Sequence, residues 1–315
     1  MELSIPRLAA KIPTEAAAYE FLEDLRWHGQ PVCPHCGSIG DHRYLEPTNK
    51  VSRETSRGKQ SERRVWKCRD CKRQFSAITN TIMHGTHVPI RTWLFVIFEM
   101  VSNKNGVAAR EVERRYDLHP KTAWFMLHRI REAMSTRDGN PFTGVLIADE
   151  TWIGGKPSNR HGHKKGQGGQ GKTDKTPVVS LVHAETGEVR SQVVTNVQGK
   201  TLRKVIAENA ILAETTLHTD TAGTYGTFAD ELAAHATVNH FAGEYVRSGV
   251  STNLAEGYFS QLKRSLDGTH HHVSREHLHR YLGEFDFRYS TCDMTDTERM
   301  GRFMGKVAGR RMSYK

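Results

Sequence analysis

Two apolar segments, residues 144–148 and 216–219, are each followed at once by an aspartate, and they predict two buried strands that end at a charged group. The aspartates are Asp149 and Asp220. A third acid, Glu256, lies further along the chain in a segment with helical periodicity. Acids at the ends of two strands and on a later helix can converge on a pair of divalent cations. Two such ions about 4 Å apart serve phosphodiester cleavage and transfer in nucleases and polymerases.

The order of the predicted elements from residue 144 onward narrows the fold class. Apolar patterns and turn signals predict three strands, a helix, a strand, a helix, a strand and a final helix. Their predicted ranges are 144–149, 178–182, 189–197, 201–210, 216–220, 225–234, 236–238 and 253–266. This is the element order of an RNase H-like core, a mixed α/β fold, and we expect that core to occupy residues 142–290.

The last of these helices carries Glu256 on a polar face. At about 100° per residue, the stripe expected to pack inward comprises Leu254, Tyr258, Leu262 and Leu266. The polar face comprises Asn253, Glu256, Ser260 and Lys263. Glu256 and Lys263 align two turns apart, which suits a carboxylate for a metal and an ammonium for a phosphate. Taken alone, such a face is more simply a solvated surface, but its place after two strand-ending aspartates favours metal binding.

Four of the five cysteines form two C-x-x-C pairs, Cys33 with Cys36 and Cys68 with Cys71. Two such pairs predict a closed tetrahedral site for one structural Zn²⁺, with an extended hairpin in the polar spacer between them. A redox pair is the alternative for the first C-x-x-C, but it leaves the second pair without a role. His35 lies between two ligands and is not expected to bind. We therefore expect an N-terminal helix at 1–30 and a zinc ribbon at 31–80.

Residues 85–137 predict a helical region with a helix-turn-helix pair at 107–116 and 120–134. In the second helix, the residues that recur at helical spacing and predict one buried stripe are Ala123, Leu127, Ile130 and Met134. Lys121, His128 and Arg129 are expected to point away from that stripe. A basic outer face on a second helix suits the DNA major groove, and an ordinary helical pair with a solvated face suits the pattern equally well.

The charge balance favours an anionic partner. The chain has 45 Lys and Arg against 35 Asp and Glu, a net charge of +10 and a pI near 9.4. Such an excess of positive charge favours an anionic binding partner such as DNA, RNA or a membrane surface, and it does not distinguish among them. The longest apolar run, residues 93–98, is far shorter than the ~20 residues of a membrane span. With no signal-peptide pattern at the N-terminus, we expect a cytoplasmic protein.

A basic, glycine-rich segment at 154–176 shows no hydrophobic periodicity and predicts a mobile loop. Six Lys or Arg residues lie in it against one acid, Asp174. We expect its cations, among them Lys156, Lys164 and Lys165, to follow a DNA backbone. Residues 291–315 predict a basic C-terminal tail.

Four sequence blocks resemble those of a known bacterial family. They are Asp149 to Lys156, His218 to Asp220, Thr252 to Arg264 and Glu284 to Tyr289. In these blocks the chain is similar to the zinc-ribbon insertion-sequence DDE transposases of the insertion sequence fifteen-ninety-five group. The family's zinc ribbon matches the four cysteines, so the resemblance extends from Cys33 to about Tyr289.

The resemblance implies a DNA transposase that binds terminal inverted repeats and catalyses metal-dependent DNA cleavage and strand transfer. It implies Asp149, Asp220 and Glu256 as ligands of two Mg²⁺ or Mn²⁺ ions, with Lys263 as their companion on the helix. Asn253 is the alternative third ligand, and a carboxylate suits a hard cation better than an amide does. Lys263 and Arg264 are expected DNA contacts. The partners implied are element and target DNA and further copies of this chain, with nucleoid association and no membrane.

Two other classes of protein share parts of this pattern. A zinc-ribbon regulator with an inactive nuclease core would not need three acids. An RNase H-like nuclease or junction resolvase would hydrolyse DNA without strand transfer, and it would have little use for both a ribbon and a helix-turn-helix pair. Inverted repeats in the flanking DNA would distinguish a transposase from both.

Overall fold

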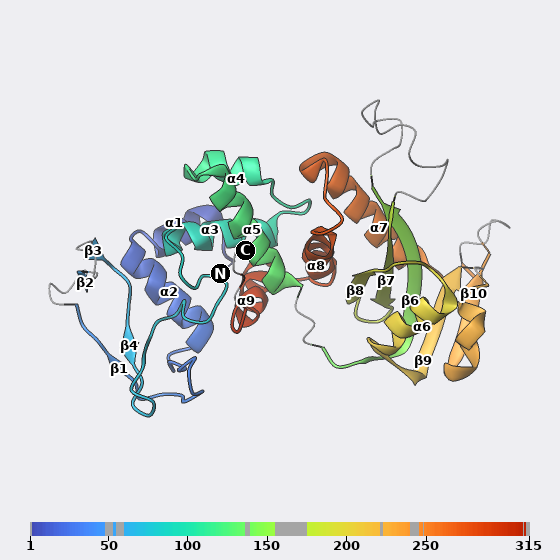
Figure 1. The fold of residues 1–315 in the computed structure, drawn as a ribbon, viewed down its shortest axis with the longest axis horizontal. Coiled ribbons are helices and arrows are strands. Elements are labelled where there is room, and N and C mark those ends of the chain that lie inside the picture. Colours follow the sequence, from blue (N-terminus) through green and yellow to red (C-terminus); the bar gives the residue numbers. More distant parts are fainter. Residues whose placement is uncertain are drawn as a thin grey trace. The chain divides into compact units, whose positions relative to one another are not determined.

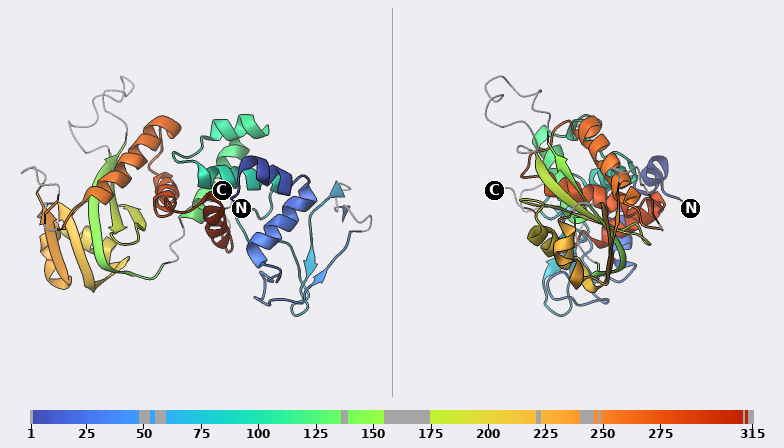
Figure 2. Two further views of the ribbon diagram at one scale, coloured as in Figure 1. Left: turned by 180° about the vertical axis from the view of Figure 1, so that it is seen from behind. Right: turned by 90° about the vertical axis from the view of Figure 1, so that its right-hand side faces the viewer.

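The structure is a computed structural model that describes residues 2–47, 53–54, 60–135, 139–154, 175–220, 223–239, 246–247, 249–310 and 312. They belong to two compact units, Met1–Ala133 with Met294–Lys315, and Met134–Asp293. Figure 1 labels the elements of both units, and Figure 2 shows them from two further directions. Among the described helices, none has the length and apolar character needed to cross a bilayer.

The first unit is mainly helical. Its helices are α1 (Ile5–Lys11), α2 (Glu15–Trp27), α3 (Ile90–Ser102), α4 (Ala109–Tyr116), α5 (Pro120–Met134) and α9 (Asp296–Gly305). The single helix predicted at 1–30 is two helices, because Pro13 interrupts the chain and Thr14 caps α2. The Glu15 carboxylate accepts hydrogen bonds from the backbone N–H groups of Ile90 and Arg91 at 2.6 and 3.0 Å, which ties α2 to the start of α3.

The C-terminal residues fold back onto this unit, so the prediction of a basic tail at 291–315 is wrong for most of its length. Helix α9 packs against α3 and α2. After it, Ile82 N–H donates to Val307 O at 3.2 Å and Gly309 N–H donates to Asn80 O at 2.8 Å. The apolar residues Met300, Phe303 and Met304 of α9 are buried. Their burial explains why this basic segment is not a solvated tail.

Helix α5 is buried on more than the predicted stripe. The stripe is buried as expected at Ala123, Leu127, Ile130 and Met134. His128 and Arg129 are also buried, at 0% and 6% exposure, so the prediction that they point to solvent is wrong. The Arg129 guanidinium lies over the rings of Trp93 and Phe125 and donates to His84 O at 2.8 Å. Aromatic neighbours on α3 and α5 thus enclose its charge.

The segment between the two cysteine pairs forms short antiparallel strands. They are β1 (Arg43–Tyr44), β2 (Arg53–Glu54), β3 (Gln60–Ser61), β4 (Trp66–Lys67) and β5 (Gln74–Phe75). One sheet has the order β1-β4-β5, and β2 pairs with β3, which confirms a hairpin in the spacer. Trp27 of α2 packs edge-on against Trp66 and Phe75, so the ribbon shares a small aromatic core with the helix before it.

The second unit is built on a five-stranded mixed sheet. Its strands are β6 (Phe142–Ile153), β7 (Thr176–His183), β8 (Val189–Val193), β9 (Ala210–Asp220) and β10 (Ala234–Val238). The spatial order is β10-β9-β6-β7-β8. Strands β6, β7 and β8 are antiparallel neighbours, whereas β9 runs parallel to both β6 and β10. This arrangement and the predicted order of elements agree with an RNase H-like core.

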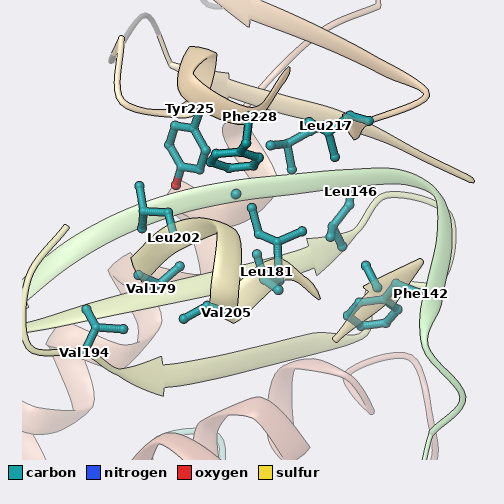
Figure 3. Packing of buried hydrophobic residues seen from close by; sticks show 14 residues of the cluster. Phe142, Leu146, Val179, Leu181, Val194, Leu202, Val205, Leu217, Tyr225 and Phe228 are labelled. Atoms are coloured by element: carbon teal, nitrogen blue, oxygen red, sulfur yellow. The ribbon is translucent and has the colours of Figure 1, made fainter. Parts of the chain in front are cut away.

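Helical segments cover both faces of this sheet. They are α6 (Gly199–Ala207), the 3₁₀ segment η4 (Tyr225–Glu231), α7 (Asn253–Ser265), the π turn η6 (Leu266–His270) and α8 (Leu278–Tyr289). One core joins α6 and η4 to Leu146, Leu181 and Leu217 of the sheet, as Figure 3 shows. The other core joins α7 and α8 to Ile147 and Val178. Adjacent residues of β6 therefore face opposite cores, as strand geometry requires.

Several predicted boundaries differ from the structure. Strand β6 continues past Asp149 to Ile153, because β7 remains hydrogen-bonded alongside it as far as Thr176. Strand β9 begins at Ala210, where the sequence predicts the end of a helix. The helix predicted at 225–234 is the shorter 3₁₀ segment η4.

Candidate metal centre and active site

The four cysteines of the ribbon converge. The sulfurs of Cys33 and Cys71 lie 3.7 Å apart, those of Cys36 and Cys68 lie 3.6 Å apart, and all four lie within 4.8 Å of one another. A tetrahedral Zn²⁺ with Zn–S bonds of about 2.3 Å separates its sulfurs by about 3.8 Å. The spacing and the donor chemistry therefore fit one zinc ion held by four thiolates.

Each cysteine pair sits in a similar backbone turn. The residue four positions after the first cysteine, Gly37 in one turn and Lys72 in the other, has a positive φ of 77° and 62° respectively. The N–H of Cys33 donates to Ser38 O and that of Cys68 donates to Arg73 O, both at 2.9 Å. These turns present two sulfurs on the same side, which makes a closed site.

In the second unit, strand register brings Asp149 and Asp220 side by side. The last paired residues of the parallel strands β6 and β9 are Ile147 and His218. Asp149 and Asp220 each lie two residues further on, so the same register puts them opposite each other. Because side chains alternate along a strand, both aspartates project from the sheet face that carries Ile147.

Helix α7 covers that same face and carries Glu256 in its first turn. Ile147 packs in one core with Ala255 and Tyr258 of α7. Glu256 is exposed, and the hydroxyl of Thr252 donates to its Oε1 at 3.3 Å. The three acids predicted from the sequence thus come from three elements that meet at one face of the sheet.

The acids are close enough to influence one another. Burial and the negative charges of Glu150, Asp220 and Glu256 raise the pKa of Asp149 to about 7, against a hydrogen bond from the Glu150 N–H. Their oxygens are not gathered as tightly as the cysteine sulfurs. Within the described residues, the cysteines alone form a group of three or more potential ligands whose atoms all lie within 4.8 Å. The acids form a looser cluster of negatively charged groups.

The exposed side of α7 carries the other predicted polar residues. Asn253, Lys263 and Arg264 are exposed, and the Lys263 ammonium lies 5.8 Å from the centroid of the Phe259 ring. The predicted apolar stripe is partly wrong. Leu254 is 37% exposed, while Phe259 is buried in the core with α8. The other three predicted residues, Tyr258, Leu262 and Leu266, are buried as expected, and Glu256 lies on the exposed side of the helix.

Glu150 projects to the opposite face, because side chains alternate along a strand. Its even-numbered neighbours Leu146 and Ala148 pack with α6 and η4. On that side lies the buried side chain of Tyr225, whose hydroxyl points toward β6 in Figure 3. Burial and the Glu150 charge raise the pKa of Tyr225 well above its usual value. No sequence pattern points to this tyrosine, because a single aromatic in a polar segment carries no periodic signal.

The predicted DNA contacts fall into three groups. Lys121, Lys263 and Arg264 are exposed, as a DNA contact requires. His128 and Arg129 are buried and unsuited to that role. The loop residues named above lie outside the described part of the chain, namely Lys156, Lys164 and Lys165.

Comparison with protein families finds a match in each of the two units. The ISXO2-like transposase domain of the IS1595 family matches residues 141–290, and the transposase zinc-ribbon domain of the same family matches residues 13–74. The chain belongs to this transposase family. The first match coincides with the five-stranded sheet and its helices, and the second contains all four cysteines. The zinc-ribbon match and the sulfur cluster together support a structural zinc.

A curated relative is also connected with mobile DNA. The chain is 24% identical over 284 residues to an uncharacterized protein in transposable element ISH50 of Halobacterium salinarum, covering 87% of this chain and 90% of that protein. Among solved structures, a simian T-cell lymphotropic virus intasome in complex with PP2A regulatory subunit B56 gamma matches at 14% identity. That match covers 56% of this chain and 63% of the other, with a TM-score of 0.28, so it carries no argument.

Proposed function

We propose that the chain is the DNA transposase of an insertion sequence, which binds terminal inverted repeats and catalyses metal-dependent cleavage and strand transfer. One observation carries the proposal: Asp149, Asp220 and Glu256 approach one another on the sheet face that α7 covers. The family match and the relative from a transposable element support the same conclusion.

The three carboxylates fit a pair of hard divalent cations, Mg²⁺ or Mn²⁺, because these ions take oxygen ligands. The negative charges of Asp220 and Glu256 act on Asp149, and cations between the three groups would offset that repulsion. When bound, such metals lower the pKa of the attacking water or hydroxyl and stabilise the leaving oxygen.

Different residues of the chain supply the metal ligands and the phosphate contact. Asp149 and Asp220 are fixed by strand register, so two ligands are held in place before DNA arrives. Glu256 completes the set from the open side of α7, where DNA has access. Lys263 lies two turns further along that side and binds a backbone phosphate. Hydrolysis frees a 3′-hydroxyl at the element end, and that hydroxyl attacks target DNA without a covalent protein intermediate.

DNA is held by exposed cations outside the acidic cluster. Lys121 lies at the start of α5 and Arg264 near the end of α7. The basic loop at 154–176 adds further phosphate contacts. We propose that copies of the chain assemble on DNA, because two element ends are joined in one event, and that the protein works in the cytoplasm with the nucleoid.

The test is a cleavage and strand-transfer assay with Mg²⁺ and DNA that carries a terminal repeat. We expect Asp149→Asn, Asp220→Asn and Glu256→Gln each to abolish both reactions while leaving DNA binding largely intact. These substitutions keep size and shape and remove only charge. Asn253→Ala is the matched control on the same turn of α7, and we expect it to remain active.

Other results would overturn specific parts of the proposal. Normal cleavage by Glu256→Gln together with loss in Asn253→Ala would make Asn253 the third ligand. Normal cleavage by both would remove α7 from the active site. Hydrolysis without joined products from the unmodified protein would indicate a nuclease rather than a transposase.

A further inference from the structure

A row of polar side chains crosses the sheet beneath α7 and α8. Asp149 of β6 is the direct cross-strand partner of Ser180 of β7, and Ser180 is the partner of Ser191 of β8. Directly opposed residues share a face, so all three project toward the two helices. Ser180 lies between the buried valines Val178 and Val182 along its strand. A hydroxyl in such surroundings is costly unless it is hydrogen-bonded.

Asp286 of α8 binds the β8 member of this row, Ser191. Its Oδ2 accepts from the backbone N–H of Ser191 at 2.8 Å, and its Oδ1 lies 2.7 Å from the Ser191 hydroxyl. The hydroxyls of Ser191 and Ser180 are 2.8 Å apart. The Tyr258 hydroxyl of α7 donates to the same Oδ1 at 2.7 Å. We call these four residues, Ser180, Ser191, Tyr258 and Asp286, the Asp286 network.

The Asp286 network holds the part of α7 that carries Glu256. Tyr258 follows Glu256 by two residues, so at about 100° per residue the two side chains leave α7 on nearly opposite sides. Tyr258 is 1% exposed, and its hydroxyl has a pKa well above the usual value because of burial and the Asp286 charge, which keeps it a donor. Fixing Tyr258 therefore fixes the rotation of the first turn of α7.

A second contact from α8 holds the same turn. The Tyr289 hydroxyl donates to Leu254 O at 3.1 Å, and its ring packs edge-on against Tyr258 with centroids 5.5 Å apart. A Cβ on Gly257 would lie 3.2 Å from the Tyr289 hydroxyl, so glycine allows the close approach. Asp286 and Tyr289 are one turn apart on α8, and both are hydrogen-bonded to residues of one turn of α7.

We propose that Asp286, Tyr258 and Tyr289 are positioning residues that set where Glu256 stands relative to Asp149 and Asp220. This inference rests on the proposed function, because it concerns the geometry of the metal site. The Asp286 network joins the strand row that includes Asp149 to the helix that carries Glu256. It therefore relates ligands on two separate elements. Loss of residues that orient metal ligands typically lowers metal affinity about 10–100-fold.

The experiment measures Mn²⁺ binding to the full-length, zinc-loaded chain by electron paramagnetic resonance, without a DNA reaction. Tyr258→Phe removes one hydroxyl and keeps the packing ring. We expect it to weaken Mn²⁺ binding about 10-fold or more. Asp286→Asn replaces an acceptor oxygen with a donor, and we expect an equal or larger loss. Tyr289→Phe tests the second contact with α7.

Two controls separate positioning from general loss of stability. Tyr116→Phe removes a tyrosine-to-carboxylate hydrogen bond of 2.8 Å, to Glu99, in the other unit. Ser265→Ala removes a buried hydroxyl from the far end of α7, where no described residue bonds to it. We expect both controls to bind Mn²⁺ as the unmodified chain does, whatever their melting temperatures.

The outcomes are distinguishable. Unchanged Mn²⁺ affinity in a folded Tyr258→Phe variant would overturn the positioning role, even if its melting temperature fell. Equal weakening in Tyr116→Phe would also overturn it, because the effect would then be global. If the unmodified chain bound no Mn²⁺, or if Asp149→Asn bound it normally, the proposed function itself would fail.

Discussion

Replacing Arg129 by methionine should destabilise the first unit without changing how the affinity for DNA depends on salt concentration. The guanidinium is 6% exposed and lies 5.4 and 5.7 Å from the ring centroids of Trp93 and Phe125. It also donates to His84 O at 2.8 Å. A side chain enclosed in this way cannot reach a phosphate, although α5 has the sequence of a basic recognition helix.

The size of the effect follows from these contacts. A hydrogen bond from a charged donor contributes about 1.5–3 kcal/mol, and a partly desolvated cation–π contact about 0.5–2 kcal/mol. Methionine retains most of the apolar stem, so the contacts of the charged group dominate the loss. We expect the free energy of unfolding to fall by about 2–4 kcal/mol, which lowers the melting temperature by about 4–16 °C for a unit of this size.

Calorimetry and DNA binding at several salt concentrations measure the two effects. Lys121→Met is the matched control, since it removes an exposed cation from the same helix. We expect it to leave the melting temperature unchanged and to lower the slope of log K against log salt by about 0.9. A stable Arg129→Met protein with a reduced slope would refute the reasoning, because Arg129 would then contact DNA.

Three further outcomes follow from the structure. Metal analysis should find about one Zn²⁺ per chain, and chelation should remove hydrogen-exchange protection from the ribbon while sparing the second unit. Zinc-free protein with a protected ribbon would contradict this. Arg288→Met removes a cation paired with the Glu284 carboxylate, which is 0% exposed. It should destabilise the second unit by about 3–5 kcal/mol by thermal unfolding, and a change below about 1 kcal/mol would contradict the pairing. Neutralising Lys156, Lys164 and Lys165 together should lower the salt slope by about three, and an unchanged slope would exclude the loop from DNA.

Much of the fold follows from local patterns. The two C-x-x-C pairs predict the sulfur cluster, because each turn is fixed by a few adjacent residues. The apolar runs that end at Asp149 and Asp220 predict the two neighbouring strands that carry these acids. Strand alternation also predicts that Glu150 faces away from them. These features depend on periods of two and 3.6 residues, which the sequence displays directly.

Other features depend on partners distant in the sequence. Strand β6 runs past Asp149 because β7 continues to pair with it, and no local pattern near Asp149 reveals that partner. Helix α5 shows one apolar stripe, yet it is also enclosed where Arg129 meets Trp93 of α3. Helix α9 carries two acids and two arginines, and its packing against α3 depends on residues about 200 positions earlier in the chain.

The Asp286 network in the candidate site also depends on partners that are distant in the sequence. Ser180 and Ser191 interrupt apolar strands, and the sequence offers no sign that a carboxylate from α8 bonds Ser191, whose hydroxyl in turn bonds Ser180. The sequence predicts Tyr258 only as part of an apolar stripe, although its hydroxyl is hydrogen-bonded. Polar groups in a core become interpretable when their hydrogen-bond partners are known.

The most direct test of the central claim is to locate the metals. Crystals of the protein with terminal-repeat DNA, soaked in Mn²⁺, can be measured at the manganese absorption edge. We predict two anomalous peaks about 4 Å apart, each within coordination distance of at least one of Asp149, Asp220 and Glu256. Peaks elsewhere in the second unit, or none in a complex that contains bound DNA, would contradict the assignment of these three acids as the catalytic centre.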